Sequence, residues 1–355
     1  MKILHIMPFL GVGGASRLMS EIIPLMNKEE DFDVDLLIGR NLNDTFMDKL
    51  KASGAMVYSL NFSQIYNPIN ILKIKPYLKN YDLIHVHLFP SLYWVAIANL
   101  FVNKPLIYTE HNTNNRRRGK WYYRIIDKWI YSKYKKIISI SPSTESSLKS
   151  WLETNDKNKF VVVNNGINII EFSNCKSEHI YPRTLINVAR FAPEKDQETI
   201  IRTMKLLDND IHLILLGEGD KMDKCKSLAD ELGVRERVHF MGSQPDVPKW
   251  LGKADIGIQS SMWEGFGLTA VEMMASGLPV IASEVEGLSQ IVNGAGILFP
   301  RGDYKKLAEI INQLFIDKDY YNSVKEKCIE RSKEYGIEKM ANSYMKVYHN
   351  IKNIK

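Results

Sequence analysis

Two glutamates on either side of a glycine turn carry the clearest chemical signal in the chain. Within residues 254–283, an apolar strand pattern runs into a Gly-Phe-Gly turn at 265–267, and an amphipathic helix follows. Glu264 precedes the turn, and Glu272 lies beyond it, with seven residues between the two. The free N–H groups at such a helix start bind phosphate, so we expect an anion site with Glu272 near an attached ribose. The alternative is a solvated acid that only favours the helix dipole.

Two cations follow a predicted strand in the second half of the chain. Arg190 comes after the strand pattern at Thr184–Val188, and Lys195 enters the next helix. Arginine can bind two phosphate oxygens at once and lysine acts as a point charge, so this pair fits a diphosphate clamp. The alternative is a pair of surface charges without a ligand.

The first half offers a histidine and a glycine loop, both directly after predicted strands. His111 follows the strand pattern at Leu106–Thr109, and the Gly-Val-Gly-Gly-Ala-Ser loop at 11–16 opens the first helix. The loop lacks the third glycine of the dinucleotide fingerprint. A lone histidine is more often structural, and His85 and His87 on the preceding strand are interpreted in that way. Because ligands of open α/β sheets bind beyond the carboxyl ends of the strands, His111 is a functional candidate.

Together these segments resemble the retaining glycosyltransferases of family 4, whose Glu-x7-Glu signature matches Glu264 to Glu272. The resemblance implies the GT-B fold, an α/β fold of two doubly wound Rossmann-like domains that face each other across a cleft. It also implies transfer of a sugar from a nucleotide-sugar to an acceptor hydroxyl with retention of configuration. The catalytic residues implied are His111, Glu264, Arg190 and Lys195.

The same resemblance assigns donor binding to residues at strand ends and helix starts. These are Gly13, Gly14, Arg190, Lys195, Gly217, Met241, Ser243, Glu264, Gly265, Phe266, Gly267, Leu268 and Glu272. Two positions depart from the family pattern: Asp196 stands where glycine is usual, and Gln290 stands where an acid is usual. The first departure questions the geometry of the loop that carries the cations.

Short apolar runs alternate with amphipathic helical patterns along the whole chain, which predicts parallel sheets covered by helices on both faces. The expected strands are Lys2–Met7, Asp33–Ile38, Ala55–Leu60, Leu83–His87, Leu106–Thr109, Lys136–Ile140, Phe160–Val163, Thr184–Val188, His212–Leu216, Val238–Phe240, Asp255–Gln259, Pro279–Ala282 and Ile297–Phe299. Helical patterns fall between them, for example at Ala15–Lys28 and Trp121–Tyr134.

The pattern is interrupted once, between residues 164 and 182, which predicts two domains in a chain too long for a usual single core. We expect an acceptor-binding domain at 1–170 and a donor-binding domain at 183–336. By the family resemblance, the last helix, 337–355, crosses back onto the first domain. Its apolar face carries Met340, Tyr344 and Tyr348.

The cysteines and the apolar segments indicate the cellular compartment in which we expect the protein. The three cysteines, Cys175, Cys225 and Cys328, are scattered and odd in number, which argues against a disulfide framework and for a reducing environment. Residues 1–8 predict a buried strand rather than a signal peptide, and the apolar segment 88–102 is too short to cross a membrane. We expect a cytoplasmic protein, or one held peripherally on the inner face of the cell membrane.

Residues 116–136 combine basic side chains with tryptophan and tyrosine at helical spacing. Such a segment could rest on anionic lipid headgroups. The alternative is a solvated basic helix whose aromatic stripe, Trp121, Ile125 and Trp129, packs into the core. No recognition motif for nucleic acid accompanies the charge, so no nucleic-acid partner is expected.

The expected partners are a nucleotide-sugar, with a UDP-sugar as the family's default donor, and a lipid-linked or oligosaccharide acceptor in bacterial capsule, O-antigen or exopolysaccharide synthesis. No cofactor and no catalytic metal are expected, because the Asp-x-Asp patterns at 31–35 stand at a strand entrance and read as solvated. Two alternatives stay open: a sugar-nucleotide 2-epimerase of the same architecture, and a non-enzymatic sugar-binding protein.

Overall fold

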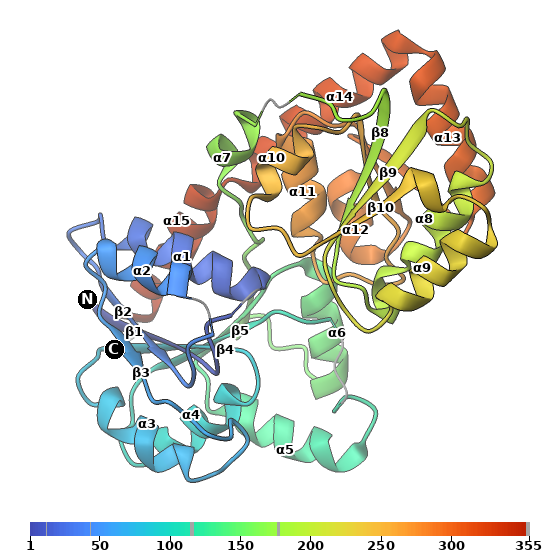
Figure 1. Ribbon diagram of the computed structural model, residues 1–355. Helices are drawn as coiled ribbons and strands as arrows, with labels where there is room; N and C mark the ends of the chain where they lie inside the picture. Colours follow the sequence, from blue (N-terminus) through green and yellow to red (C-terminus); the bar gives the residue numbers. More distant parts are fainter. Residues whose placement is uncertain (12, 43, 114–116, 176–177, 353–355) are drawn as a thin grey trace. The chain divides into compact units, whose positions relative to one another are not determined.

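The protein divides into two compact units in a computed structural model that describes residues 1–11, 13–42, 44–113, 117–175 and 178–352 (Figure 1). The first unit comprises residues 1–166 together with 337–355, and the second comprises residues 167–336. Each unit is built around one parallel sheet, so the predicted doubly wound α/β fold class is confirmed.

The first unit contains a seven-stranded sheet of order β3-β2-β1-β4-β5-β6-β7. Its strands are β1 (Lys2–Met7), β2 (Asp33–Ile38), β3 (Val57–Ser59), β4 (Leu83–His87), β5 (Leu106–Glu110), β6 (Lys136–Ser139) and β7 (Phe160–Val162). Its helices are α1 (Gly14–Met26), α2 (Asp44–Ala52), α3 (Asn70–Leu78), α4 (Ser91–Asn99), α5 (Trp121–Ser132), α6 (Pro142–Leu152) and α15 (Ile337–Lys352).

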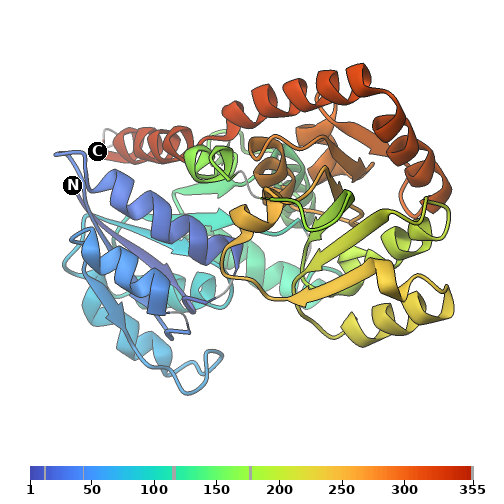
Figure 2. The same cartoon turned by 45° about the horizontal axis from the view of Figure 1, so that its top comes forward.

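The second unit contains a six-stranded sheet of order β10-β9-β8-β11-β12-β13, also seen after rotation in Figure 2. Its strands are β8 (Arg183–Val188), β9 (Ile211–Leu216), β10 (Val238–Gly242), β11 (Ile256–Gln259), β12 (Val280–Ser283) and β13 (Ile297–Phe299). Its helices are α7 (Ile169–Ser173), α8 (Gln197–Met204), α9 (Met222–Glu231), α10 (Val247–Leu251), α11 (Leu268–Ala275), α12 (Glu286–Val292), α13 (Tyr304–Ile316) and α14 (Lys318–Ser332), with short 3-10 turns at Pro193–Lys195, Arg235–Arg237 and Lys333–Tyr335.

Every strand that the apolar runs predict is present, with ends that differ by two residues at most. The third strand is shorter than the expected Ala55–Leu60, and β5 continues one residue further than expected, to Glu110. The helix expected at Ala15–Lys28 ends earlier, at Met26, and α5 ends at Ser132 rather than Tyr134. Strand periodicity locates the element, whereas its last residue depends on neighbouring contacts.

Strands β4 and β5 are buried along their length, and β1 is buried from Ile3 onward, as expected for a parallel sheet with both faces covered. Polar side chains nevertheless stand among the apolar ones. His5 on β1, His85 and His87 on β4, and Thr109 on β5 have no exposed surface. A buried polar group is costly unless it is hydrogen-bonded, so these four side chains require partners inside the unit.

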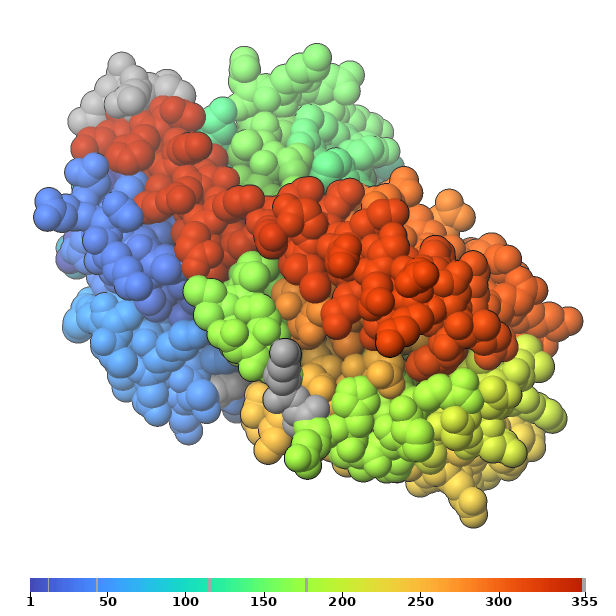
Figure 3. All heavy atoms as spheres, turned by 90° about the horizontal axis from the view of Figure 1, so that it is seen from above, coloured from blue at the N-terminus to red at the C-terminus, as the bar shows by residue number. Residues whose placement is uncertain are grey.

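The last helix, α15, supplies some of the hydrogen-bond partners of these buried polar side chains. Helix α15 packs against α1, and the two run side by side in Figures 2 and 3, where α15 is deep red and α1 is blue. Its buried face includes Met340, Tyr344 and Tyr348. The C-terminal segment therefore completes the core of the first unit.

Among the described residues, none of the helices combines the length and the apolar character that crossing a membrane requires.

Candidate active site

Loops at the carboxyl edge of the second sheet hold one another through backbone hydrogen bonds. The N–H of Phe191, after β8, donates to the carbonyl of Glu218, after β9, at 2.9 Å. The N–H of Gly217 donates to the carbonyl of Gly242, at the end of β10, at 2.8 Å. The N–H of Met262, after β11, donates to Glu194 at 2.8 Å. Four segments far apart in the sequence thus form one continuous rim.

Two glycines allow this close approach. A Cβ on Gly217, which has a φ of +130°, would lie 2.1 Å from the carbonyl oxygen of Ala189. A Cβ on Gly287 would lie 2.2 Å from the carbonyl oxygen of Glu264. Since heavy atoms cannot approach so closely, a side chain at either position would displace the rim.

The rim places Lys195 against Glu264. The Lys195 ammonium donates to the Glu264 carboxylate, and both side chains are mostly buried. The other carboxylate oxygen of Glu264 accepts from the N–H of Gly265 at 3.2 Å. Helix α11 begins at Leu268, directly after Gly267, which is in a left-handed conformation with a φ of 97°. A cation, a carboxylate and a helix start therefore lie next to one another, as an anion site with a sugar neighbour requires.

The loop that carries Lys195 keeps its geometry although Asp196 replaces the usual glycine. Asp196 has a φ of 47° and a ψ of 47°, the left-handed region in which glycine is favoured and aspartate is tolerated. The Thr199 hydroxyl donates to the Asp196 carboxylate at 2.6 Å, and the Ser260 hydroxyl donates to the Asp196 carbonyl at 2.8 Å. The local conformation explains why the position favours glycine, and these bonds hold it without one.

Arg190 is placed differently from Lys195. Its guanidinium pairs with Glu194 at 2.8 Å, and 72% of its side chain is exposed. The clamp expected from the sequence is therefore not assembled in this structure. An exposed pair of this kind is worth about 1 kcal/mol or less, so a phosphate can replace Glu194 as the partner of Arg190 at little cost.

Glu272 is the fifth of the eight residues of α11 and is only 8% exposed, so the alternative of a solvated helix-start acid is wrong. Phe266 is also buried, and its ring meets Tyr335 edge-on at 5.4 Å between centroids. Its side chain belongs to the core of the second unit, which leaves the backbone of this residue as the part that can bind a ligand.

The remaining donor-site candidates of the second unit lie on the same rim. Met241 is 37% exposed at the end of β10, and the N–H of Ser243 donates to the Glu218 carboxylate at 3.3 Å. Leu268 is the first residue of α11. The segment 241–243 is therefore a surface strand end whose side chains are open to solvent or a ligand.

In the first unit, Gly13 precedes α1 and Gly14 begins it. A Cβ on Gly13 would meet nothing within 4 Å, and its backbone is extended, so the fold itself does not require glycine there. Val12, between the loop's glycines, lies outside the described residues. The open space beside Gly13 is compatible with the close approach of a ligand.

His111 follows β5 and is half-buried. The residue before it, Glu110, accepts from the Tyr131 hydroxyl at 2.7 Å and from Arg118 at 3.1 Å, which fixes the strand end. The Nε2 of His111 lies 3.2 Å from the Nδ1 of His87. Burial lowers the pKa of His111 to about 4, so its imidazole is neutral at physiological pH.

The sequence did not show which residues the buried histidines contact. One ring nitrogen from each of His5, His85 and His87 lies within 4.8 Å of the other two, a spacing that could hold a metal ion. Their neutrality is favoured by burial, which lowers the pKa of all three. The alternation of histidine with apolar residues on β4 was the available signal, but it could not name the partners on β1 and α15.

The structure contradicts one of the two interpretations of the basic aromatic segment, in which its aromatic stripe packs into the core. Trp121, Ile125 and Trp129 of α5 are 73%, 61% and 45% exposed, so the stripe does not pack into the core. The buried face of α5 consists of Asp127, Ile130 and Tyr131 instead. Arg116, the first residue of the predicted segment, lies outside the described residues.

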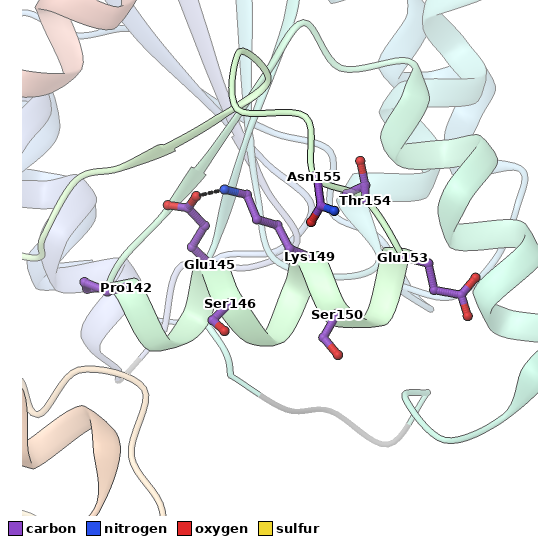
Figure 4. A pocket seen from close by; sticks show the side chains of 8 residues that line it. All are labelled: Pro142, Glu145, Ser146, Lys149, Ser150, Glu153, Thr154 and Asn155. Atoms are coloured by element: carbon purple, nitrogen blue, oxygen red, sulfur yellow. Dashed lines mark hydrogen bonds and ion pairs between the residues drawn. The ribbon is translucent and has the colours of Figure 1, made fainter.

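A surface hollow beside α6 contains none of the predicted site residues (Figure 4). It is lined by Pro142, Glu145, Ser146, Lys149, Ser150, Glu153, Thr154 and Asn155. Its charged groups are already paired: Lys149 with Glu145, and Glu153 with Arg124 and Lys128 of α5. This hollow therefore does not compete with the rim of the second sheet as a ligand site.

Comparison with known families gives two matches in succession. The family described as Glycosyltransferase Family 4 matches residues 12–170, and the family described as Glycosyl transferases group 1 matches residues 176–334. Together the two matches span most of both units.

Individual relatives agree with the families. The N-acetylgalactosamine-N,N'-diacetylbacillosaminyl-diphospho-undecaprenol 4-alpha-N-acetylgalactosaminyltransferase of Campylobacter jejuni is 24% identical over 366 residues, 95% of this chain and 96% of that protein. A lipopolysaccharide core biosynthesis glycosyltransferase of Rhizobium meliloti is 32% identical over 152 residues, 42% of this chain and 43% of that protein. The crystal structure of the Anabaena protein HepE in complex with UDP and glucose has a TM-score of 0.86 at 20% identity, covering 99% of this chain and all of that one. This likeness, with the two sheets, identifies the fold as GT-B.

Proposed function

Because this chain belongs to the group 1 glycosyltransferases of the family 4 type, we propose that it transfers a sugar from a nucleotide-sugar to an acceptor hydroxyl with retention of configuration. The observation that carries the proposal is the mostly buried Lys195–Glu264 pair at the start of α11, with Glu272 buried further along the same helix. These groups offer a cation, a helix start and carboxylates to a diphosphate and its two sugars.

The proposed donor site binds the nucleotide-sugar through charged groups, two of which are mostly buried. Lys195 and the N–H groups of 265–267 bind the diphosphate, and Arg190 joins when it leaves Glu194. Since negative charge grows on the diphosphate as the sugar departs, these fixed positive groups stabilise the transition state more than the ground state. Glu272 accepts hydrogen bonds from the ribose, and Glu264 contacts the donor sugar.

In the transfer step, the bond between the anomeric carbon and the diphosphate oxygen breaks, and the acceptor oxygen bonds to the same carbon from the same face. The acceptor's proton passes to the departing diphosphate oxygen. His111, as a neutral imidazole, supports the donor sugar through its N–H rather than through a positive charge. No metal or cofactor takes part in this proposal.

We propose a UDP-sugar as donor and a lipid-linked or oligosaccharide acceptor in bacterial surface polysaccharide synthesis. UDP-sugars are the default donors of the family, and the acceptor class follows what the names of the Campylobacter and Rhizobium relatives describe. The exposed aromatic face of α5, flanked by Arg124 and Lys128, supports a peripheral position on an anionic membrane surface.

The membrane part of the proposal is tested with vesicles. The full chain should co-sediment with anionic phosphatidylglycerol vesicles and not with neutral phosphatidylcholine vesicles. A Trp121→Ser, Trp129→Ser double variant should lose this binding. Phe101→Ser, which removes another exposed aromatic ring of the first unit, serves as the control and should retain it. Equal binding by all variants would remove α5 from the membrane proposal.

The donor site is tested by thermal shift of the purified chain with UDP, GDP, ADP and their sugar conjugates. Stabilisation by one nucleotide family, lost in Glu272→Ala, would support the site, since a ligand that binds the folded state raises the melting temperature. The absence of any shift at millimolar nucleotide would contradict it. Release of free nucleotide only when an acceptor is supplied separates transfer from 2-epimerisation.

A further inference from the structure

Seven polar side chains of the first unit, six of them without exposed surface, form one unbranched series of hydrogen bonds. Its contacts, in order, are Tyr344 Oη to Thr109 Oγ1 (3.2 Å), Thr109 Oγ1 to His85 Nε2 (2.8 Å), His85 Nδ1 to Tyr348 Oη (2.6 Å), Tyr348 Oη to His5 Nε2 (3.1 Å), His5 Nδ1 to His87 Nε2 (2.9 Å) and His87 Nδ1 to His111 Nε2 (3.2 Å). The chain therefore runs from α15 through β5, β4 and β1 to the strand end that carries His111.

Counting hydrogens limits how this chain can be arranged. A neutral imidazole has one N–H and one acceptor nitrogen, and a hydroxyl has one O–H. The seven groups thus supply seven hydrogens for six contacts, which leaves one hydrogen over. An imidazole inside the chain uses both nitrogens in contacts, so the extra hydrogen belongs to one of the hydroxyls or to the free nitrogen of His111.

Burial decides between these positions. Tyr344, Tyr348 and Thr109 have no exposed surface. Among the described residues, their hydroxyls form hydrogen bonds only with other members of this hydrogen-bond series. A leftover O–H on any of them would be a buried donor without an acceptor, which is costly. His111 is half-buried, and its Nδ1 has no partner among the described residues. The extra hydrogen is therefore tolerated best on His111.

We propose that this buried chain, from Tyr344 to His87, is a positioning network that fixes His111 as the tautomer with its hydrogen on Nδ1. The assignment follows step by step. Each group donates toward His111, so that His87 Nδ1–H donates to His111 Nε2. His111 then presents an N–H donor on its remaining nitrogen. The inference rests on the proposed function, since the ligand that would receive this hydrogen bond is an oxygen of the donor sugar.

The proposed tautomer of His111 differs from the one that a free histidine side chain prefers. A neutral histidine side chain in water carries its hydrogen mainly on Nε2. Without the network, His111 would offer a lone pair at Nδ1 to the donor sugar for most of the time. With it, His111 offers a donor, which can stabilise an oxygen that gains negative charge. Burial also lowers the pKa of every histidine in the chain, which keeps the imidazoles neutral, as the count requires.

A metal ion is the competing occupant of His5, His85 and His87. All six of their ring nitrogens already have hydrogen-bond partners in the structure. Binding of an ion would therefore break several of these bonds in a site without exposed surface. The hydrogen-bond chain uses every nitrogen as it stands, so the geometry favours it over an ion.

The test is nitrogen NMR of the full-length protein labelled with ¹⁵N-histidine. The His111 signals are assigned by their loss in His111→Gln, and the ring couplings show which nitrogen carries the hydrogen. We expect hydrogen on Nδ1. Hydrogen mainly on Nε2 would overturn the inference, as would a shift of the His5, His85 and His87 signals on addition of Zn²⁺.

A variant tests the network itself. Tyr348→Phe removes the link between His85 and His5, so the Nε2–H form of His111 should become detectable. If the two tautomers become equally populated, half of the molecules keep the donor, and kcat falls by about twofold with the donor KM unchanged. Tyr134→Phe is the matched control, because this buried tyrosine donates to the Leu92 carbonyl at 2.6 Å and lies outside the chain. An unchanged His111 tautomer in Tyr348→Phe would overturn the role of the network.

The readout also separates this inference from the proposed function. Hydrogen on Nε2 in a protein that binds a sugar nucleotide would refute the network and leave the transferase proposal intact. Hydrogen on Nδ1 in a protein that binds no nucleotide would support the network and refute the donor site.

Discussion

The two units hold their candidate residues in opposite physical settings. In the second unit, Lys195 and Glu264 stand on loops at the edge of a sheet and neutralise each other's charge. In the first unit, His111 ends a chain of neutral groups, most of them without solvent contact. A charged rim can rearrange when an anion arrives, whereas a buried neutral network can keep one side chain in one protonation state. We infer that the second unit supplies binding and the first supplies orientation.

The strongest test of this contrast is the dependence of stability on pH. Burial lowers the pKa of His5 to about 3, and those of His85 and His87 also lie well below their ordinary value. Between the unfolded pKa near 6.5 and the lowered folded values, only the unfolded chain takes up protons. Stability is therefore complete above pH 6.5 and falls as the pH drops, by about 2 kcal/mol for each buried histidine at pH 5.

Urea unfolding at pH 7.5, 6 and 5 checks this expectation. His5→Gln removes one of the three groups, so its stability should depend less steeply on pH than that of the natural chain. A midpoint that stays constant across this range would contradict the neutral network.

The next largest effect is expected at the end of the network. His111→Ala should lower kcat by about 10²–10³-fold, because it removes a donor that acts on developing charge. Steady-state release of nucleotide in the presence of acceptor measures it. His349→Ala, on α15 of the same unit, should keep normal turnover. Normal turnover in His111→Ala would exclude it from the mechanism.

On the charged rim, Lys195→Ala should weaken donor binding by about 10- to 100-fold, since a hydrogen bond to a charged group is worth about 1.5–3 kcal/mol. It also leaves Glu264 without its cation, and that carboxylate then repels phosphate. Lys195→Ala with Glu264→Gln should recover part of the loss. Calorimetric titration with a sugar nucleotide measures both, with Lys205→Ala, an exposed lysine after α8, as the control. Equal affinities of Lys195→Ala and the natural protein for the sugar nucleotide would refute the proposed role of Lys195 in donor binding.

The smallest effect concerns the loop that carries Lys195. Asp196→Ala should lower the free energy of unfolding by about 1–2 kcal/mol, because alanine is disfavoured in the left-handed conformation and cannot bond Thr199. Asp196→Gly should be nearly neutral, since glycine gains the conformation and loses the bond. Thermal unfolding compares the two. An Asp196→Ala protein as stable as Asp196→Gly would show that the backbone conformation is unimportant.

The local sequence pattern was sufficient to predict the secondary-structure elements and the motifs that follow them. The strands could be located from short apolar runs, because a buried parallel strand is apolar on both faces. The candidate anion site at 264–267 was predicted from the glycine turn and the helix that follows it. Even the departure at Asp196 could be noticed, although only the φ angle explained why glycine is usual there.

Other features depended on contacts that no local pattern encodes. The sequence could not show that the exposed face of α5 carries Trp121 and Trp129, that Arg190 pairs with Glu194, or that Phe266 is a core residue.

Periodicity and short motifs in the amino-acid sequence were enough to predict the two-sheet fold, the family and the positions of the charged candidates. The surroundings of His111, in contrast, are visible only in the folded chain. Its network joins residues as distant as His5 and Tyr348. The physical reason is that the direction of a hydrogen bond between neutral groups depends on all of its neighbours in space, and those neighbours are brought together only when the chain has folded.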